Sequence, residues 1–358
     1  NLSLSVPSLP AGAVIHYTLD GSDPRAPGGA VNTTPAPLTY NAPFPLATNT
    51  VVRARTRSTA GVWSALQEGF FQLASSPPVP AGAVVPGELH FNPTGNTDAE
   101  FIELVNVSAA AVNLRGCRFT AGIDFAFSGF RDTLLAPGQR IVLVQSEFIH
   151  RQRYSWDRRI AGIYSGSLNN AGEALTLVRG VDNIFSFSFN SSWQLLADGG
   201  GRSLTLIKPT QGKNLEAPEN WRSSSSTDGT PGAGDVGPAF TGSPAADADG
   251  DGISALMEYS LGSSDSQPDP DAGIAASLPT VPGGLPFFSY TRAAAADDAI
   301  LLPQIATDLT TWQSGTDWLQ PVSEVVLPDG RIRVTLAPGS GFPVGQRAFF
   351  RLRATPRP

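Results

Sequence analysis

Four carboxylates in the stretch DADGDGISALME, residues 247–258, carry the clearest chemical signal in this sequence. They stand at positions one, three, five and twelve of the stretch, and a glycine at position six falls where a loop must turn sharply. This spacing fits the template of a calcium-binding loop, D-x-D-x-D-G followed by five residues and a glutamate. Aspartates packed this closely repel one another unless a hard cation neutralises them, and Ca²⁺ accepts about six to eight oxygen ligands in a flexible geometry.

The template also predicts the ligands residue by residue. Positions one, three, five and twelve bind through carboxylate oxygens, and position seven offers its backbone oxygen. We therefore predict a structural Ca²⁺ held by Asp247, Asp249, Asp251, Ile253 and Glu258. Asp265, a short distance downstream, is an additional candidate, and a solvated acidic linker without a metal is the alternative interpretation.

The segments that must position this loop differ from those of a paired EF-hand. The residues upstream are rich in proline and glycine, so no helix is expected to lead into the loop. Downstream, SALMEYSLG predicts a short helix with Ser254 as its cap and with Leu256, Tyr259 and Leu261 on its buried side. The stretch resembles the aspartate-rich calcium loops of thrombospondin type 3 and dockerin modules. Its expected role is structural, because a bound ion rigidifies a joint between domains.

The composition limits the class of protein. The chain has a net charge of −7, a pI near 5.0 and no basic run, which argues against a nucleic-acid partner. No uninterrupted run of about 20 apolar residues is present, so no transmembrane span is predicted. Cys117 is the only cysteine, so an intrachain disulfide and a cysteine-based zinc site are excluded, and we expect a buried, inert thiol in a strand.

The 358 residues predict several domains, and the 37 glycines and 31 prolines favour short strands and turns over long helices. The sequence begins at Asn1, without a methionine or a signal peptide. We therefore expect it to be a portion of a longer precursor.

Residues 1–74 are predicted to form a small β domain. IHYTLDGSDP is a strand that runs into a turn, where Asp20, Ser22 and Asp23 are expected to bond backbone groups. VRARTR alternates arginine with smaller residues, as a half-buried strand does. Together with PLTYNAPFPL, these pieces resemble the immunoglobulin-like domain from the C-terminus of chitobiase and β-hexosaminidase. The resemblance implies a β-sandwich appended to secreted enzymes and surface proteins, without hexosaminidase activity.

A proline-rich linker is expected over residues 75–86 and a larger β-sandwich over residues 87–233. The pieces ELHFNPTGNTDAEFIELVNVS, LAPGQRIVLV and YSGSLNNAGEALTLVRG occur in the order found in the lamin-tail domain and resemble that family. The resemblance implies an immunoglobulin-like sandwich that mediates attachment or assembly in bacterial envelope proteins and brings no catalytic residues. One helical insertion is predicted within residues 145–159.

Two acidic residues and three histidines are the remaining candidates for catalysis. Glu100 and Glu103 are three apart on a predicted strand and so point to opposite faces, where each is expected to bond a turn or an arginine. His16, His90 and His150 are not spaced as metal ligands, and we expect each to be exposed or hydrogen-bonded, with His150 in an arginine-rich loop. No G-x-S-x-G or H-E-x-x-H motif is present. We predict no enzyme activity; a calcium-dependent hydrolase would need an open coordination position at the loop.

The C-terminal part is divided into a flexible linker at 234–246, the calcium loop and helix at 247–272, and a β domain at 273–358. In the last of these, the motifs TDLTTW and FFRLR give a resemblance to small β modules that follow calcium loops in secreted bacterial proteins. Trp312 and Trp318 could form a face on which carbohydrate stacks, although packing in or around a core is the simpler interpretation.

These observations predict an all-β, multidomain chain of immunoglobulin-like β-sandwiches in tandem with a short calcium loop-helix segment. The expected function is a non-catalytic, calcium-stabilised adhesion or assembly region of a secreted or cell-surface bacterial protein. A carbohydrate-binding accessory region of an extracellular enzyme and a subunit of a self-assembling extracellular fibre are the alternatives. The expected partner is a protein or glycan at the cell surface, or another copy of the chain.

Overall fold

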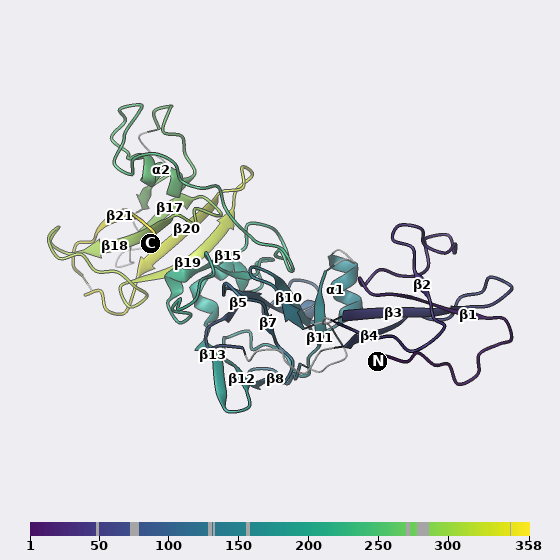
Figure 1. Cartoon of the computed structure of the whole chain (residues 1–358). Coiled ribbons are helices and arrows are strands. Elements are labelled where there is room, and N and C mark those ends of the chain that lie inside the picture. The colour runs from purple at the N-terminus through teal and green to yellow at the C-terminus, as the bar shows by residue number, and fades with distance from the viewer. Residues whose placement is uncertain are drawn as a thin grey trace.

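The computed structural model of the protein describes residues 1–47, 50–71, 79–127, 131, 133–154, 158–269, 273–277, 286–343 and 345–358. Within these ranges the chain forms 21 β-strands and two α-helices, so the predicted all-β class is confirmed. Three β-rich domains follow one another along the chain (Figure 1).

The first domain is an antiparallel sheet with the strand order β2-β1-β3-β4. Its strands are β1 (Val14–Thr18), β2 (Leu38–Thr39), β3 (Thr50–Arg57) and β4 (Gln67–Phe71). Ile15 and Val52 are buried, as the alternating pattern predicts. On β3, Arg55 pairs with Asp23, which also accepts the backbone N–H of Arg25 at 2.9 Å. The prediction that the Asp23 side chain bonds a backbone group of the turn is therefore confirmed.

The second domain is a sandwich of a six-stranded sheet, β11-β10-β6-β5-β14-β15, and a three-stranded sheet, β13-β12-β8, with a short β7-β9 pair. The strands are β5 (Val84–His90), β6 (Phe101–Asn106), β7 (Val112–Asn113), β8 (Cys117–Ala121), β9 (Leu134–Leu135), β10 (Arg140–Val144), β11 (Ile160–Ile163), β12 (Ala174–Arg179), β13 (Asp182–Ser188), β14 (Leu204–Leu206) and β15 (Trp221–Ser223). Leu104 from the larger sheet and Leu177 from the smaller one belong to a single buried core that also contains Trp221. The core therefore lies between the two sheets.

Short helices connect these strands. They are η1 (Thr97–Ala99), α1 (Glu147–Arg153), η2 (Ser191–Trp193), η3 (Leu195–Ala197) and η4 (Pro218–Asn220). Helix α1 is the predicted insertion, and the Ser146 side chain caps it by accepting the Ile149 N–H at 3.4 Å. A second, smaller apolar cluster forms on the larger sheet, where Phe101 and Val142 pack with Tyr154 at the end of α1.

The last domain packs a four-stranded sheet, β16-β17-β20-β19, against the pair β18-β21. Its elements are α2 (Ala255–Leu261), β16 (Ala275–Ser277), β17 (Phe287–Arg292), β18 (Ala299–Ala306), β19 (Leu319–Val326), β20 (Ile332–Pro338) and β21 (Phe349–Pro356). Phe288, Ile305 and Val334 lie in its core. Leu196 belongs to η3 of the second domain, yet it is buried in this same core. The second domain therefore completes the packing of the last one.

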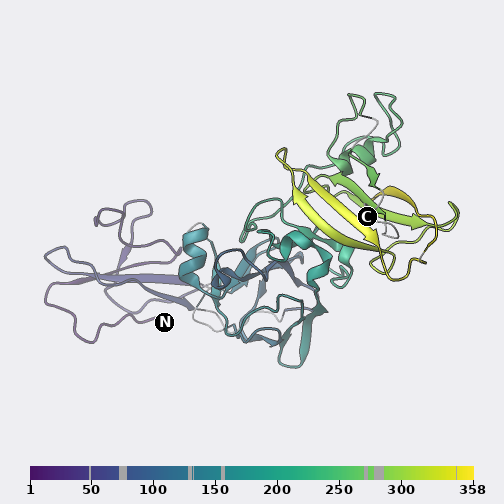
Figure 2. The same cartoon turned by 180° about the vertical axis from the view of Figure 1, so that it is seen from behind.

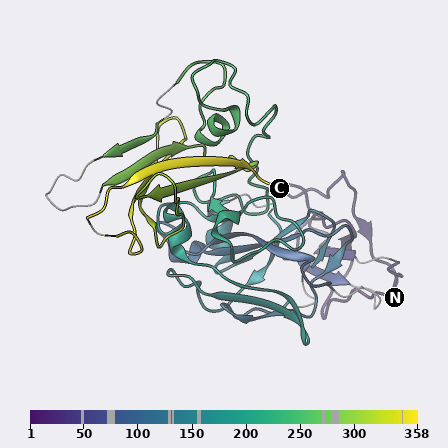
Figure 3. The same ribbon diagram turned by 90° about the vertical axis from the view of Figure 1, so that its left-hand side faces the viewer.

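The three domains lie in a row, with the second between the first and the last, as the front and back views agree (Figures 1 and 2). Helix α2 lies on the side of the last domain's strands that faces away from the second domain (Figure 3). None of the described helices has the length and apolar character needed to cross a membrane.

The boundary before the second domain differs from the sequence-based prediction. Strand β5 begins at Val84, and Val79 is already buried in the core of the second domain. Residues 79–86 therefore belong to this domain and are not a linker. Residues 72–78, which include the end of the predicted first domain and the start of the predicted linker, lie outside the described residues.

Candidate metal centre and the adjoining domain joint

The loop before α2 brings the three predicted aspartates together. One carboxylate oxygen from each of Asp247, Asp249 and Asp251 lies within 4.8 Å of the other two. Backbone N–H groups hold Asp247 in place, since it accepts hydrogen bonds from Gly250 at 2.8 Å and Gly252 at 3.1 Å. Both glycines have positive φ, at 77° and 94°, which other residues rarely adopt. The glycine at position six is therefore required by the turn, as the template predicts.

Glu258, in the middle of α2, is a buried acid on which the charges of Asp249 and Asp251 act, although it is not among the carboxylates that lie within 4.8 Å of one another. Its residue surface is only 1% exposed, and its Oε2 has no hydrogen-bond partner within the described ranges; the same is true of the buried Oδ2 of Asp249. Burial, the charge of Asp249 and a hydrogen bond with Asp265 raise the pKa of Glu258 to about 7. Leaving carboxylate oxygens buried without partners is costly, and a cation at the loop would supply the missing contacts.

The residues present fit Ca²⁺. The predicted side-chain ligands are all carboxylates, the hard oxygen donors that Ca²⁺ prefers, and no sulfur or imidazole is among them. The additional candidate, Asp265, accepts the N–H of Ala248 at 3.0 Å and so lies at the start of the loop. Ser254 occupies the N-cap position of α2, as predicted, although its side chain makes no capping hydrogen bond. Residues 270–272, the last three of the predicted calcium segment, lie outside the described residues.

Helix α2 connects the loop to the rest of the last domain. Leu256 and Leu261 are buried as predicted, and Tyr259 is half-buried. The Tyr259 hydroxyl donates to the backbone oxygen of Pro238 at 2.7 Å and accepts the backbone N–H of Asp298 at 3.3 Å. One residue, directly after a predicted metal ligand, therefore contacts two other segments of the chain.

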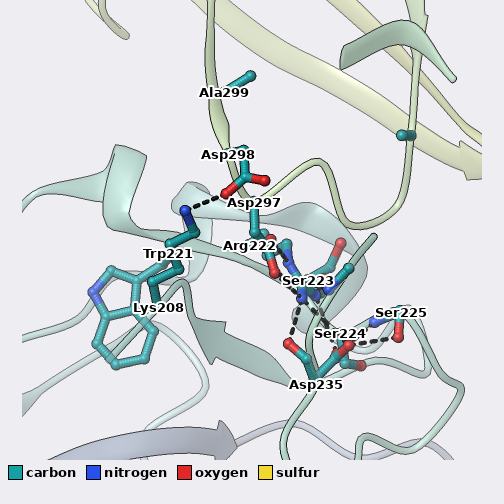
Figure 4. Close-up of polar contacts among 12 residues, drawn as sticks. Lys208, Trp221, Arg222, Ser223, Ser224, Ser225, Asp235, Asp297, Asp298 and Ala299 are labelled. Carbon is teal, nitrogen blue, oxygen red and sulfur yellow. Dashed lines mark hydrogen bonds and ion pairs between the residues drawn. The ribbon is translucent and has the colours of Figure 1, made fainter. Parts of the chain in front are cut away.

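A buried ion-pair network joins the second domain to the last domain (Figure 4). Arg222 on β15 donates from Nε to Asp297 at 2.6 Å and from Nη1 to Asp235 at 3.1 Å, and all three side chains are at most 5% exposed. Burial acts against the charge of Arg222, but the bonds to Asp297 and Asp235 outweigh it and raise the pKa of Arg222. Asp235 belongs to the segment 234–246, so the prediction of a flexible linker is wrong there: its first residues pack inside the joint.

Further contacts extend this joint. Lys208 of the second domain pairs with Asp298 (Figure 4). Asp298 also accepts the backbone N–H of Phe240 at 2.5 Å. The hydrogen bond with Lys208 is the main reason that the pKa of Asp298 is lowered. The N–H of Leu196, the residue inserted in the last domain's core, donates to Glu324 at 3.2 Å. Apolar and ionic contacts therefore act together at the boundary between the domains.

Sequence reasoning did not find the joint residues Arg222, Asp297 and Asp298. The available signal was the pair of adjacent aspartates in AAAADDAI, because two acids in an alanine-rich stretch indicate a specific polar contact. Arg222 and Asp297 are 75 residues apart in sequence, so nothing local indicates that they are partners.

Glu100 and Glu103 have the structural roles that the sequence predicts. Glu103 pairs with Arg140 and accepts the Gly232 N–H at 2.8 Å. Glu100 accepts the Leu168 N–H at 2.8 Å. The two carboxylates hold different segments of the second domain and do not converge on one reacting atom.

Glu88 is a buried acid that the sequence analysis missed. It lies beside Glu103 on the neighbouring strand, accepts the Ser203 hydroxyl and accepts the Thr230 N–H at 2.8 Å. Burial and the charge of Glu103 raise the pKa of Glu88 to about 8. Together, Glu88 and Glu103 fix the returning segment at residues 230–232, which leads toward the joint.

The prediction for two of the histidines is wrong. His90 and His150 are 0% and 1% exposed, and within the part of the chain that the structure describes neither ring nitrogen of either has a hydrogen-bond partner. His150 lies in α1, not in a loop, and both histidines contact the ring of Phe101. Burial lowers the pKa of His90 to about 3 and that of His150 to about 4. Both are therefore neutral side chains in an apolar cluster.

Three smaller predictions concern the aromatic, turn and thiol groups. Trp318 packs against the core of the last domain, and the guanidinium of Arg351 covers the Trp312 ring at 4.2 Å from its centre, which supports the packing interpretation. Asp20 accepts the Ser22 N–H at 3.0 Å, as expected for the turn. Cys117 is fully buried in β8, as predicted, and burial raises the pKa of its thiol to about 11.

Comparison with known proteins identifies two of the modules. The family model "Lamin Tail Domain" matches residues 77–213, and the model "Chitobiase/beta-hexosaminidase C-terminal domain" matches residues 1–68. Both resemblances stated from the sequence are confirmed, and the chain therefore carries two accessory domains of the immunoglobulin-like class.

The remaining comparisons add little. A crystal structure of a DUF4876 family protein from Bacteroides thetaiotaomicron VPI-5482 is 9% identical and covers 59% of this chain and 90% of that one, with a TM-score of 0.27. A likeness this slight carries no argument about fold or function. No curated protein matches the chain.

Proposed function

We propose that this chain is a non-catalytic region of a secreted or cell-surface bacterial protein, and that a structural Ca²⁺ in the loop at residues 247–258 stabilises it for adhesion or assembly. Two accessory domains of the immunoglobulin-like class support the non-catalytic role. Among the residues that the structure describes, the buried Oε2 of Glu258 has no hydrogen-bond partner, and the charges of Asp249 and Asp251 act on this carboxyl; this is the observation that carries the calcium part of the proposal.

Ca²⁺ would be held by the residues predicted from the sequence, namely Asp247, Asp249, Asp251, the backbone oxygen of Ile253 and Glu258. The bound ion would supply the positive charge that the clustered carboxylates lack. The glycine turn that brings Asp247, Asp249 and Asp251 together supports the proposal, and the ion would order the loop further by relieving the repulsion among its carboxylates. Because the unfolded chain does not hold this arrangement, Ca²⁺ stabilises the folded state by mass action.

Calorimetric titration of the full chain with CaCl₂ tests the proposal directly. At a free concentration of 100 times the dissociation constant, one site adds about 2.7 kcal/mol to the free energy of unfolding. Glu258→Gln should weaken binding strongly, whereas Glu219→Gln, in η4 of the second domain, is a matched control that should not. Absence of a binding heat in millimolar CaCl₂, with an unchanged melting temperature, would rule the calcium site out.

The adhesion or assembly role predicts a partner that is a protein or glycan at the cell surface, or a second copy of the chain. Glycan-array binding and light scattering over a range of protein concentrations separate these partners. A chain that stays monomeric and retains no glycan or surface protein would contradict this part of the proposal.

A further inference from the structure

The calcium loop and the joint between the last two domains share one short chain of contacts. Glu258, a proposed ligand, and Tyr259 are adjacent in α2. Tyr259 bonds Pro238 and the N–H of Asp298, and Asp298 pairs with Lys208 of the lamin-tail domain. In this chain of contacts, Tyr259 and Asp298 therefore lie between the proposed ion site and the lamin-tail domain.

The segment between the domains is held at both of its ends by this arrangement. Near its start, the Gly237 N–H donates to Asp297 at 3.1 Å and the Phe240 N–H donates to Asp298 at 2.5 Å. Near its end, the backbone oxygen of Ala246 accepts the N–H of Ala255, the first residue of α2, at 2.7 Å. A shift of α2 would therefore disturb the segment from both sides.

We propose that Ca²⁺ binding at the loop and docking of the lamin-tail domain on the last domain are coupled through Tyr259. The inference rests on the proposed calcium site. Its physical basis is the position of α2. The ion fixes Glu258, and with it the helical turn that places the Tyr259 hydroxyl between Pro238 and Asp298. Without the ion, repulsion among the loop carboxylates loosens that turn and the joint opens more often.

Coupling of this kind is reciprocal, so a tighter joint also strengthens Ca²⁺ binding. It gives the protein a stiff connection between its last two domains when extracellular calcium is present and a looser one when it is absent. The buried pairs of Arg222 with Asp235 and Asp297 set the docked geometry, and Tyr259 links that geometry to the ion.

Hydrogen exchange measured by mass spectrometry on the full chain, with CaCl₂ or with EGTA, tests this coupling. Two peptides are compared, one covering the loop at 248–253 and one covering the joint at 236–241. In the wild type, Ca²⁺ should slow exchange in both peptides, by about tenfold in the joint. Tyr259→Phe, which removes one hydroxyl, should keep the slowing in the loop and lose most of it in the joint. Tyr40→Phe in the first domain is the matched control and should behave as the wild type.

A second variant keeps the test independent of α2. Lys208→Gln removes the ion pair to Asp298 from the lamin-tail side and should also reduce the effect of Ca²⁺ on the joint. If Ca²⁺ protects the loop of the wild type but not the joint, the coupling is wrong and the calcium site stands. If calorimetry detects no binding and neither peptide responds, both the calcium site and the coupling are wrong.

Discussion

Acidification should destabilise the lamin-tail domain through His90 and His150. Both histidines have a folded-state pKa below the ordinary value of 6.5, at about 3 and about 4, because they are buried. As the pH falls, the unfolded chain takes up a proton at each histidine before the folded chain does. Their contribution to stability is therefore complete above pH 6.5 and is lost as the pH falls toward the folded-state pKa values.

The magnitude follows from the size of these shifts. A mismatch of one pH unit corresponds to about 1.4 kcal/mol for each group. Between pH 7 and pH 5, each histidine should therefore remove about 2 kcal/mol, and the pair about 4 kcal/mol, from the free energy of unfolding. Neighbouring charges have smaller effects: Arg153 lowers the pKa of His90 further, while Arg151 and Glu147 act in opposite directions on His150.

The assay must separate this loss of stability at low pH from an opposite effect of pH on stability. Glu88 has a raised pKa, so its contribution to stability increases as the pH falls from about 8 toward 4.5. We therefore compare the wild type with the double variant His90→Leu, His150→Leu, because both retain Glu88. Amide exchange in β6 and β10, corrected for its intrinsic pH dependence, gives the free energy of opening. The variant should gain about 4 kcal/mol relative to the wild type between pH 7 and pH 5.

Proton NMR offers a direct check, because the chain contains only three histidines. The reasoning is refuted if His90 or His150 titrates near pH 6.5 while the protein remains folded. The reasoning is also refuted if the free energy of opening changes equally with pH in the wild type and in the double variant.

Two further substitutions test the joint between the domains. Leu196→Ala leaves a cavity in the core of the last domain and should cost about 2–5 kcal/mol in urea unfolding, whereas Val322→Ala, at an exposed position of β19, should change little; equal effects of the two would contradict the inserted position of Leu196. Arg222→Leu leaves Asp235 and Asp297 buried without a counter-charge and should cost about 3–5 kcal/mol. Adding Asp235→Asn and Asp297→Asn to Arg222→Leu should recover part of that loss. If Arg222→Leu alone leaves the free energy of unfolding unchanged, that result argues against a buried network.

The sequence alone determined the features that depend on short-range spacing. The calcium-loop template predicted the clustering of Asp247, Asp249 and Asp251 and the glycine of the turn, because these residues are close neighbours in the sequence. The alternation of VRARTR and the ordered lamin-tail pieces likewise predicted strands and sandwiches. Local periodicity encodes which side chains of a strand face a core.

Only the tertiary structure decided which distant groups meet. Arg222 finds Asp297 across 75 residues, and Leu196 fills the core of a domain that follows it in the chain. His90 and His150 are buried together because α1 folds over the larger sheet, although each looks like an ordinary polar residue in its own segment. The physical reason is that burial and ion pairing depend on how separate elements pack, and the spacing of neighbours in the sequence does not determine that packing.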